Sequence, residues 1–210
     1  MTPATQLLLA ALGGYLVGGI PFGLLIGKLH GVDVRQHGSG NIGATNVGRI
    51  CGRRWGVLCF VLDAGKGFLP VWLAGHYGDV AGTGNGVAIV AALGAVGGHV
   101  WCPYLRFKGG KGIATAAGVL VGVDWAVLLA AVAVWIVLMA VCRYVSLASM
   151  GAAVTLPTAG LLLRRPWREH WPELLLLTVV AAIAVWRHRA NLARLAAGTE
   201  PKIGSKQKTP

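Results

Sequence analysis

The sequence predicts an all-α integral membrane protein, a bundle of seven transmembrane helices, some short or broken, with an external N-terminus and a cytoplasmic C-terminus. Of its 210 residues, 55% are hydrophobic and only 12% are charged, whereas soluble domains carry about 25% charged residues. The apolar residues form segments of about 20, the length that a helix needs to cross a bilayer. Because these segments consume the chain, we expect one transmembrane domain over residues 1–200 and a basic cytoplasmic tail over residues 201–210.

Basic residues set the orientation of the first predicted span, residues 6–27. Pro21 lies near its inner end, where a proline kinks the helix and frees a backbone carbonyl that protein must cover. Residues 28–54 then carry five Lys or Arg against the single acid Asp33. Short loops rich in Lys and Arg lie in the cytoplasm. We therefore expect this connection inside, after a retained first helix whose N-terminus lies outside.

The second and third predicted spans cover residues 55–75 and 86–102. Residues 76–85 between them contain no Lys or Arg, which favours an external connection. Asp63 and Lys66 lie within the second span, three residues apart and therefore on one helix face. Charges in hydrocarbon are costly, so we expect these two to neutralise each other and point into the bundle. They form either a structural ion pair or part of a site.

The second half of the chain leaves the span count open at one place. Residues 113–142 are apolar but interrupted at 122–125, so they form either a single tilted span or a hairpin of two short crossings. An apolar run to Leu163, an interfacial stretch at 164–172 and a last span at 173–186 follow. The basic segment 187–210 indicates a cytoplasmic C-terminus. This requires an odd number of spans, or a re-entrant pair in place of two spans. The hairpin gives seven, at the cost of external arginines at 164, 165 and 168.

The net charge of +12 does not indicate a nucleic-acid-binding protein, because the charges lie in short runs between apolar segments. Positive-inside topology, anionic substrates and lipid headgroups explain that distribution better. The four cysteines form no Cys-x-x-Cys pair and are expected to act as small hydrophobic residues. We therefore expect no metal site, no bound cofactor and no nucleic-acid partner.

A glycine-rich polar loop over residues 38–49 is the first motif that carries chemistry. Its glycines admit positive φ, so that successive backbone amides can converge on an anion. These glycines are Gly38, Gly40 and Gly43. Short polar side chains and one cation accompany them: Ser39, Asn41, Thr45, Asn46 and Arg49. The set suits a phosphate group, which needs convergent donors and a bidentate cation. Considered alone, the loop is interpreted equally well as a solvated linker.

The second motif covers residues 107–115 and is basic. Lys108 and Lys111 flank Gly109 and Gly110, and we expect a helix to begin directly afterwards. The orphan amides and the dipole of a helix N-terminus would favour an anion at the same place. For the two lysines alone, positive charge beside a membrane is the better interpretation.

The third motif covers residues 188–200. His188, Asn191 and Arg194 are spaced by three residues, so they share one face of a helix that we expect to lie along the membrane surface. A single histidine near a helix end is most often an interfacial residue. The two other phosphate-suited motifs on the predicted cytoplasmic side favour a site instead.

Together the motifs resemble those of the acyl-phosphate-dependent glycerol-3-phosphate acyltransferases of bacterial membranes. The matching residues are Gly-Ser-Gly-Asn-Ile-Gly-Ala-Thr-Asn-Val-x-Arg at 38–49, Phe-Lys-Gly-Gly-Lys-Gly-Ile-Ala-Thr at 107–115, His-x-x-Asn-Leu-x-Arg-Leu-x-x-Gly-x-Glu at 188–200, Ile-Pro-Phe-Gly at 20–23 and Asp-Ala-Gly-Lys-Gly at 63–67. The resemblance implies transfer of a fatty acyl group from acyl phosphate to the 1-hydroxyl of sn-glycerol 3-phosphate, giving lysophosphatidic acid and phosphate. It also implies a seven-helix protein of the bacterial inner membrane whose metal-independent site faces the cytoplasm.

The resemblance also implies which residues form the site. The catalytic set is Ser39, Arg49, Lys108, Lys111, His188 and Asn191. The substrate-binding set is Gly38, Gly40, Asn41, Gly43, Thr45, Asn46, Gly109, Gly110, Gly112, Thr115, Arg194 and Glu200. Expected partners are acyl phosphate, glycerol 3-phosphate, membrane lipids and the soluble enzyme that makes acyl phosphate.

An acyl phosphate is already activated, so direct attack requires no acyl-enzyme, and cations would hold both phosphates while neutral donors stabilise the oxyanion. His188 is the best candidate base, although a substrate phosphate oxygen can take the proton instead. The alternative function is a membrane transporter or channel for an organic phosphate, since broken helices and basic motifs also suit an anion pathway. A phosphatidyltransferase is disfavoured because the paired aspartates of an Asp-x-x-Asp-Gly motif are absent.

Overall fold

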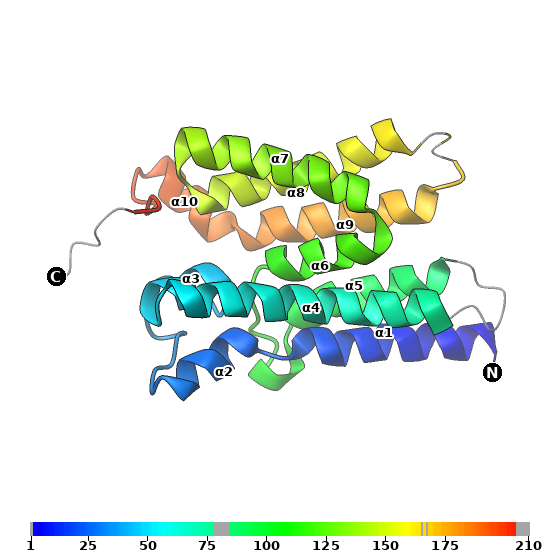
Figure 1. The fold of residues 1–210 in the computed structure, drawn as a ribbon, viewed down its shortest axis with the longest axis horizontal. Helices are drawn as coiled ribbons and strands as arrows, with labels where there is room; N and C mark the ends of the chain where they lie inside the picture. The colour runs from blue at the N-terminus through cyan, green and yellow to red at the C-terminus, as the bar shows by residue number, and fades with distance from the viewer. Residues whose placement is uncertain (1, 78–84, 165, 167, 205–210) are drawn as a thin grey trace. The chain divides into compact units, whose positions relative to one another are not determined.

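The computed structural model describes residues 2–77, 85–164, 166 and 168–204, and every regular element in these ranges is helical (Figure 1). The helices are α1 (Pro3–Gly19), α2 (Phe22–Leu29), α3 (Ala44–Ile50), α4 (Arg53–Tyr77), α5 (Gly86–Val100), the 3₁₀ helix η2 (Pro103–Leu105), α6 (Ile113–Val123), α7 (Trp125–Cys142), α8 (Val145–Leu163), α9 (Trp171–Arg187) and α10 (Arg189–Ala196). The prediction of an all-α protein is therefore confirmed.

The chain divides into two compact units, an N-terminal unit over Met1–Trp125 and a C-terminal unit over Ala126–Pro210. The N-terminal unit contains α1 to α6, and the C-terminal unit contains nearly all of α7 and the helices that follow it. The single domain expected over residues 1–200 stays a prediction. The two units are described separately below.

The first predicted span is broken where Pro21 predicts a break. Helix α1 ends at Gly19 and α2 begins at Phe22, which leaves carbonyl groups at the break without their helical partners. The Lys66 ammonium donates to the Ile20 carbonyl at 2.6 Å, and the Cys102 thiol donates to the Gly19 carbonyl at 3.0 Å. Protein groups thus cover the exposed carbonyls, as the hydrocarbon environment requires.

Glycines let α1 and α5 pack backbone against backbone. A Cβ added to Gly14 or Gly18 of α1 would meet the carbonyl oxygens of Ala91 and Ala95 at 2.3 and 2.1 Å. The same holds for Gly98 of α5, where an added Cβ would lie 2.0 Å from the Tyr15 carbonyl oxygen. Small residues at four-residue spacing allow helices in lipid to approach this closely and gain van der Waals contact. The α1–α5 pair forms the most extensive helix contact of the N-terminal unit.

A second close helix pair, α4 and α6, completes the N-terminal unit. A Cβ added to Gly67 would lie 2.1 Å from the Thr115 carbonyl oxygen, and one added to Gly118 would lie 1.8 Å from that of Ala64. Helix α6 has only 11 residues and stops at Asp124, whose φ of −157° and ψ of 89° are not helical. The interrupted region is therefore two helices, and a single continuous helix is excluded there.

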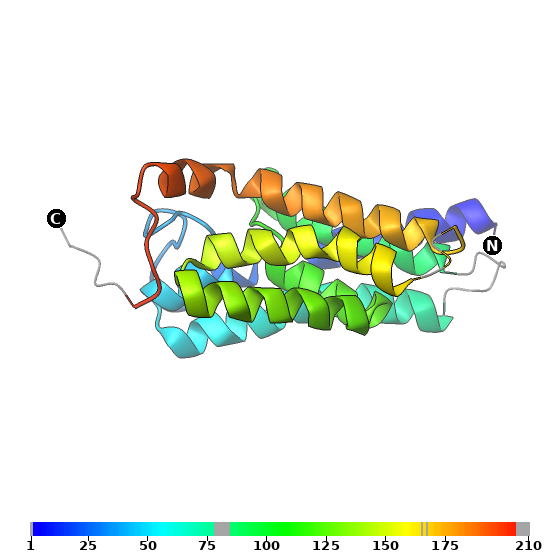
Figure 2. The ribbon, with the colours of Figure 1, turned by 90° about the horizontal axis from the view of Figure 1, so that it is seen from above.

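In the C-terminal unit α7, α8 and α9 run side by side, as Figures 1 and 2 both show. Gly160 of α8 leaves room for side chains of α9 to pack against α8, since a Cβ added to Gly160 would lie 2.6 Å from Leu177 Cδ1. The Trp135 indole donates to the Ser149 hydroxyl at 3.3 Å and joins α7 to α8. Helices α9 and α10 are bent by 51° at His188.

Within the part of the chain that the structure describes, five helical segments are long and apolar enough to cross a membrane, or six if α9 and α10 count as one bent span, and α6 is a shorter apolar helix. This pattern supports a multi-pass membrane protein. The count of seven and the orientation of the termini stay predictions. Parts of three predicted regions lie outside the described residues: the external connection at 78–84, the interfacial residues Arg165 and Trp167, and the tail from 205 to 210.

Candidate functional site: two polar loops and a buried carboxylate

Asn46 organises the glycine-rich loop from inside. Its side chain is buried, and its Oδ1 accepts a hydrogen bond from the Ser39 amide at 2.9 Å. Its Nδ2 lies 2.9, 3.1 and 2.9 Å from the carbonyl oxygens of Val34, His37 and Asn41. One amide side chain therefore contacts four backbone groups of residues 34–41, with its two N–H hydrogens shared among three carbonyl oxygens, which gives the loop a defined shape without regular structure.

Two of the three loop glycines adopt the conformation that their residue type permits. Gly38 has φ of 60° and Gly40 has φ of 68°, a region that costs other residues about 1–2 kcal/mol. Gly43 differs, because its φ is −80° and it caps α3. Its amide donates to Asn41 Oδ1 at 2.8 Å, so Asn41 also holds the loop together.

Apolar side chains anchor the underside of the loop to α2 and α4. Val34, Ile42 and Val47 are buried with Leu24, Ile26 and Cys59 in one cluster. Gly23 of α2 makes this approach possible, since a Cβ there would overlap the Ile42 carbonyl oxygen at 1.7 Å. The loop is therefore a rigid support, on which Ser39, Thr45 and Arg49 remain exposed.

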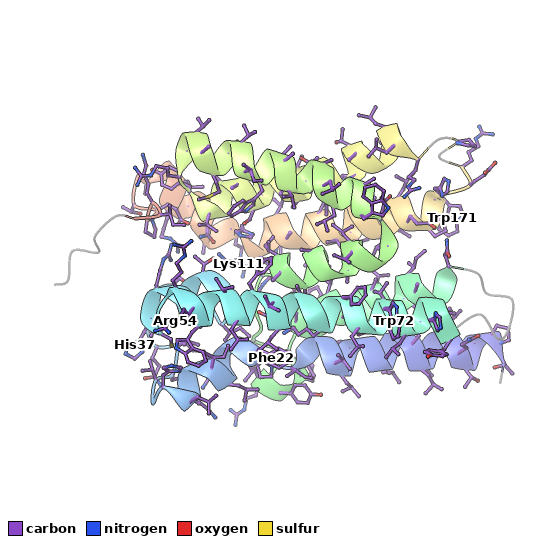
Figure 3. The ribbon with its side chains drawn as sticks, viewed as in Figure 1. Phe22, His37, Arg54, Trp72, Lys111 and Trp171 are labelled. Carbon is purple, nitrogen blue, oxygen red and sulfur yellow. The ribbon has the colours of Figure 1, made fainter. Side chains whose placement is uncertain are left out.

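Arg35, a further cation near this loop, is engaged by Asp33. Its Nη2 lies 2.6 Å from Asp33 Oδ2, and its backbone amide donates to Asp33 Oδ1 at 3.0 Å. These hydrogen bonds lower the pKa of Asp33 to about 2. Figure 3 shows His37 and Arg54 at one end of the N-terminal unit, with Phe22 at the α1–α2 break and Trp72 toward the opposite end. The loop motif thus lies at one end of the unit.

The lysine motif is tied to the end of α5 through its glycines. The Gly109 amide donates to the Val100 carbonyl at 3.1 Å, and the Gly110 amide donates to the His99 carbonyl at 3.0 Å. These two amides therefore hold the loop and are not available to an incoming phosphate. The cations beside them are the exposed Lys108 and the half-buried Lys111.

Helix α6 begins directly after the lysine motif, as predicted. Gly112, with φ of 82°, turns the chain into its first residue, Ile113. Thr115 is completely buried, and among the described residues its hydroxyl oxygen has no hydrogen-bond partner. Its backbone packs against Gly67 of α4, so the structure places Thr115 inside the N-terminal unit. The roles of Gly112 and Thr115 in substrate binding stay predictions.

The third motif is organised by Glu200, which is buried. Its Oε1 accepts hydrogen bonds from Ser146 Oγ at 2.6 Å and from Asn191 Nδ2 at 2.7 Å. Its Oε2 accepts one from Arg194 Nε at 2.7 Å. Glu200 therefore joins α10 to the first turn of α8. Sequence reasoning missed Ser146, which lies outside the three motifs and had no local signal.

His188 sits at the junction of α9 and α10 and is buried. Its Nδ1 lies 2.7 Å from the Ala184 carbonyl oxygen, which can only accept a hydrogen bond. This contact assigns the proton of the neutral ring to Nδ1 and the lone pair to Nε2. That tautomer suits a proton acceptor, one of the two roles predicted for His188.

The pKa of Glu200 shows what its hydrogen bonds achieve. Burial raises this pKa, but hydrogen bonds from Ser146, Asn191 and Arg194, together with the charge of Arg194, outweigh burial and bring it below the ordinary value of 4.5. A carboxyl group whose folded-state pKa is lowered stabilises the fold above its unfolded pKa. The stabilisation of the fold by ionised Glu200 is therefore full above pH 4.5, and it is lost as the pH falls through the lower pKa that Glu200 has in the folded protein.

We expect Glu200→Gln to lower the free energy of unfolding at neutral pH by about 1–3 kcal/mol, because charge-assisted hydrogen bonds are replaced by neutral ones. Thermal unfolding of both proteins in detergent across the acid range measures this. The difference between them should shrink below pH 4.5, because the unfolded wild-type chain takes up a proton at Glu200 there while the folded protein, with its lower pKa, resists it. A difference that stays constant down to pH about 3 would contradict this account.

Fold and loops together define a class: a multi-pass helical membrane protein whose anchored polar loops present cations and short donors suited to a phosphate group. The chain matches the family model for glycerol-3-phosphate acyltransferase over residues 8–198. The chain therefore belongs to the glycerol-3-phosphate acyltransferase family, which confirms the predicted family and enzyme class. A transporter, the alternative prediction, has no support from this match.

Named relatives cover almost the full length. The chain is 48% identical over 192 residues to the glycerol-3-phosphate acyltransferase of Trichlorobacter lovleyi, covering 91% of this chain and 94% of that protein. It is 47% identical over 199 residues to that of Erythrobacter litoralis, covering 94% and 95%.

Two solved structures show the same similarity. The crystal structure of PlsY (YgiH), an integral membrane glycerol 3-phosphate acyltransferase, in its glycerol 3-phosphate form matches with a TM-score of 0.85 and 40% identity, covering 94% of this chain and 96% of that one. Its lysophosphatidic acid form matches with a TM-score of 0.83 and 39% identity, covering 94% and 95%.

Proposed function

We propose that this protein transfers a fatty acyl group from acyl phosphate to the 1-hydroxyl of sn-glycerol 3-phosphate, releasing lysophosphatidic acid and phosphate. The observation that carries the proposal is the full-length similarity to solved relatives in glycerol 3-phosphate and lysophosphatidic acid forms. We propose further that it acts in the bacterial inner membrane with seven spans and its site toward the cytoplasm, because the basic motifs follow the positive-inside rule.

The proposed reaction is one displacement at the acyl carbon. The glycerol 1-hydroxyl oxygen forms the new bond to that carbon, the bond from carbon to the phosphate oxygen breaks, and phosphate leaves with the electron pair. The hydroxyl proton passes to a base, for which the His188 tautomer is suited. Because the acyl phosphate is activated, positioning and electrostatics can supply most of the rate, up to about 7–11 kcal/mol.

The chain offers cations and donors for the two phosphates of this reaction. In the N-terminal unit, exposed Arg49 and Lys108 and half-buried Lys111 lie on supports held by internal hydrogen bonds. In the C-terminal unit, Glu200 orients Asn191 and Arg194. Preorganised supports matter because they lower the ordering cost that binding would otherwise carry. Ser39 is proposed as a neutral donor to the oxyanion, not as a nucleophile.

A defined reconstitution tests the activity. Purified protein is incubated with acyl phosphate and labelled glycerol 3-phosphate in the presence of a chelator, and lysophosphatidic acid and inorganic phosphate are measured. We expect one phosphate released for each lysophosphatidic acid formed. Parallel reactions replace acyl phosphate with the acyl thioesters of coenzyme A and of carrier protein. Product from a thioester but none from acyl phosphate would overturn the proposed donor.

Removing a proposed phosphate ligand should weaken substrate binding. We expect Lys108→Met to raise the KM of one substrate by about 10–100-fold, because a charge-assisted hydrogen bond contributes about 1.5–3 kcal/mol. Lys28→Met is the matched control, since Lys28 is also exposed but lies in α2 outside the motifs. Steady-state kinetics with each substrate varied in turn gives both constants. An unchanged KM for both substrates would exclude Lys108 from phosphate binding.

A further inference from the structure

A buried ionisable cluster lies next to the lysine motif within the N-terminal unit. Asp63, Lys66 and His99 are 2%, 4% and 3% exposed. Lys66 Nζ lies 2.7 Å from Asp63 Oδ1, which confirms the predicted ion pair. His99 Nδ1 lies 3.9 Å from the same carboxylate oxygen. Charged groups at membrane depth are costly, so a buried cluster of this kind calls for a role beyond packing.

The cluster connects two interrupted backbone segments. On one side Lys66 donates to the Ile20 carbonyl at the α1–α2 break, at 2.6 Å. On the other side the His99 carbonyl accepts the Gly110 amide, at 3.0 Å. Asp63 lies between them: its Oδ1 pairs with Lys66, and His99 Nδ1 is 3.9 Å from the same oxygen, close but beyond hydrogen-bond distance. Lys66 thus joins this carboxylate to the α1–α2 break, and His99 carries the lysine motif on its backbone carbonyl.

His99 lies directly against the glycine pair of the lysine motif, with its ring at Gly110 and its backbone carbonyl at Gly109. A Cβ added to Gly110 would lie 2.2 Å from His99 Nε2, and one added to Gly109 would lie 1.9 Å from the His99 carbonyl oxygen. Real Cβ atoms do not approach other heavy atoms so closely, so only glycine fits at both positions. The imidazole thus forms the surface on which Gly110 rests, and the His99 carbonyl group lies against Gly109.

We propose that Asp63 and His99 are positioning residues for phosphate binding. Asp63, 3.9 Å away, orients the His99 ring, the ring supports Gly110 while the His99 carbonyl supports Gly109, and these glycines set the spacing of Lys108 and Lys111. Neither residue contacts substrate in this proposal. The inference rests on the proposed phosphate-binding role of the lysine motif, and it assigns a purpose to the buried ionisable residues of α4 and α5.

The steric contact between residues 99 and 110 provides a specific test. Gly110→Ala places a methyl group against the ring and should raise the KM that Lys108→Met raises, by about tenfold or more, since small displacements in a site can cost up to about 100-fold. His99→Ala and Asp63→Asn should raise the same KM. In the double variant His99→Ala/Gly110→Ala the clash is absent, so its KM should be no higher than that of His99→Ala alone.

The control is Gly122→Ala, a substitution in α6 beyond the motif. Its Cβ would lie 2.7 Å from Val71 Cγ1, so it creates steric crowding of a comparable kind in the same helix. We expect it to lower thermal stability and leave KM unchanged. Because KM does not depend on the concentration of folded enzyme, partial unfolding of a variant does not imitate the expected result.

Three outcomes separate the proposals. Raised KM in the single variants, with a double variant no worse than His99→Ala, supports the positioning role. If Lys108→Met raises KM but His99→Ala and Asp63→Asn do not, the positioning role is overturned and the phosphate role of the lysine motif stands. If Lys108→Met leaves KM unchanged for both substrates, both proposals are overturned.

Discussion

Replacing Asn46 with aspartate is expected to abolish acyl transfer and to lower the free energy of unfolding by about 3–5 kcal/mol. The buried Nδ2 of Asn46 lies within 3.1 Å of three backbone carbonyl oxygens. Aspartate puts an oxygen in the place of Nδ2, so that an acceptor faces three acceptors, and the buried negative charge keeps only the Ser39 amide as a donor. The loop that carries Ser39 and Arg49 should then lose its shape.

Asn41→Asp is the matched control, because it makes the same chemical change in the same loop. Asn41 uses its Oδ1 to accept the Gly43 amide at 2.8 Å, and a carboxylate preserves that acceptor. We expect this variant to retain the thermal stability of the wild type in detergent, whereas Asn46→Asp unfolds at a clearly lower temperature. Equal unfolding temperatures for the two variants would show that Asn46 does not organise the loop.

The second large effect is expected from Gly118→Ala, at the contact of α4 and α6. The added methyl carbon would lie 1.8 Å from the Ala64 carbonyl oxygen. Because the obstacle is helix backbone, the two helices must separate, and we expect a loss of about 3 kcal/mol or more in the free energy of unfolding. Separation also shifts α6, whose first turn follows the lysine motif, so activity should fall with stability.

Gly65→Ala in α4 is the control, since an added Cβ there has no atom within 4 Å. It should be neutral or slightly stabilising, because alanine is the better helix former by about 1 kcal/mol. Size-exclusion behaviour and thermal unfolding in detergent distinguish the two variants. If Gly118→Ala is as stable as Gly65→Ala, the close packing of α4 against α6 does not contribute to the stability of the protein.

Much of the local structure could be predicted because its causes are local. Pro21 cannot continue a helix, and α1 and α2 separate there. Asp63 and Lys66 are one helical turn apart, so their pairing follows from helix geometry. Of the three loop glycines expected to permit positive φ, Gly38 and Gly40 adopt it, whereas Gly43 has φ of −80° at the start of α3. The interruption at 122–125 predicted a break but left its form open, and the structure has one at Asp124.

The sequence could predict which types of residue form the candidate site, but not which groups their side chains contact. The three motifs contain the cations and short donors that a phosphate needs, and the comparisons confirm the family they indicated. Their individual roles in binding and catalysis remain predictions. The structure adds that Asn46 and Glu200 use their side chains to organise neighbouring polar groups, which their residue types alone do not reveal.

By itself, then, the sequence determined an all-helical membrane protein, its helix breaks and its phosphate-suited motifs, because hydrophobic segment length, proline, glycine and charge act over a few residues. Tertiary structure alone decided which partner each polar group has. Ser146 meets Glu200 across 54 residues of chain, and the Gly109 and Gly110 amides are taken by the end of α5. A buried polar group must find a partner, but only the packing of distant helices determines which one is near.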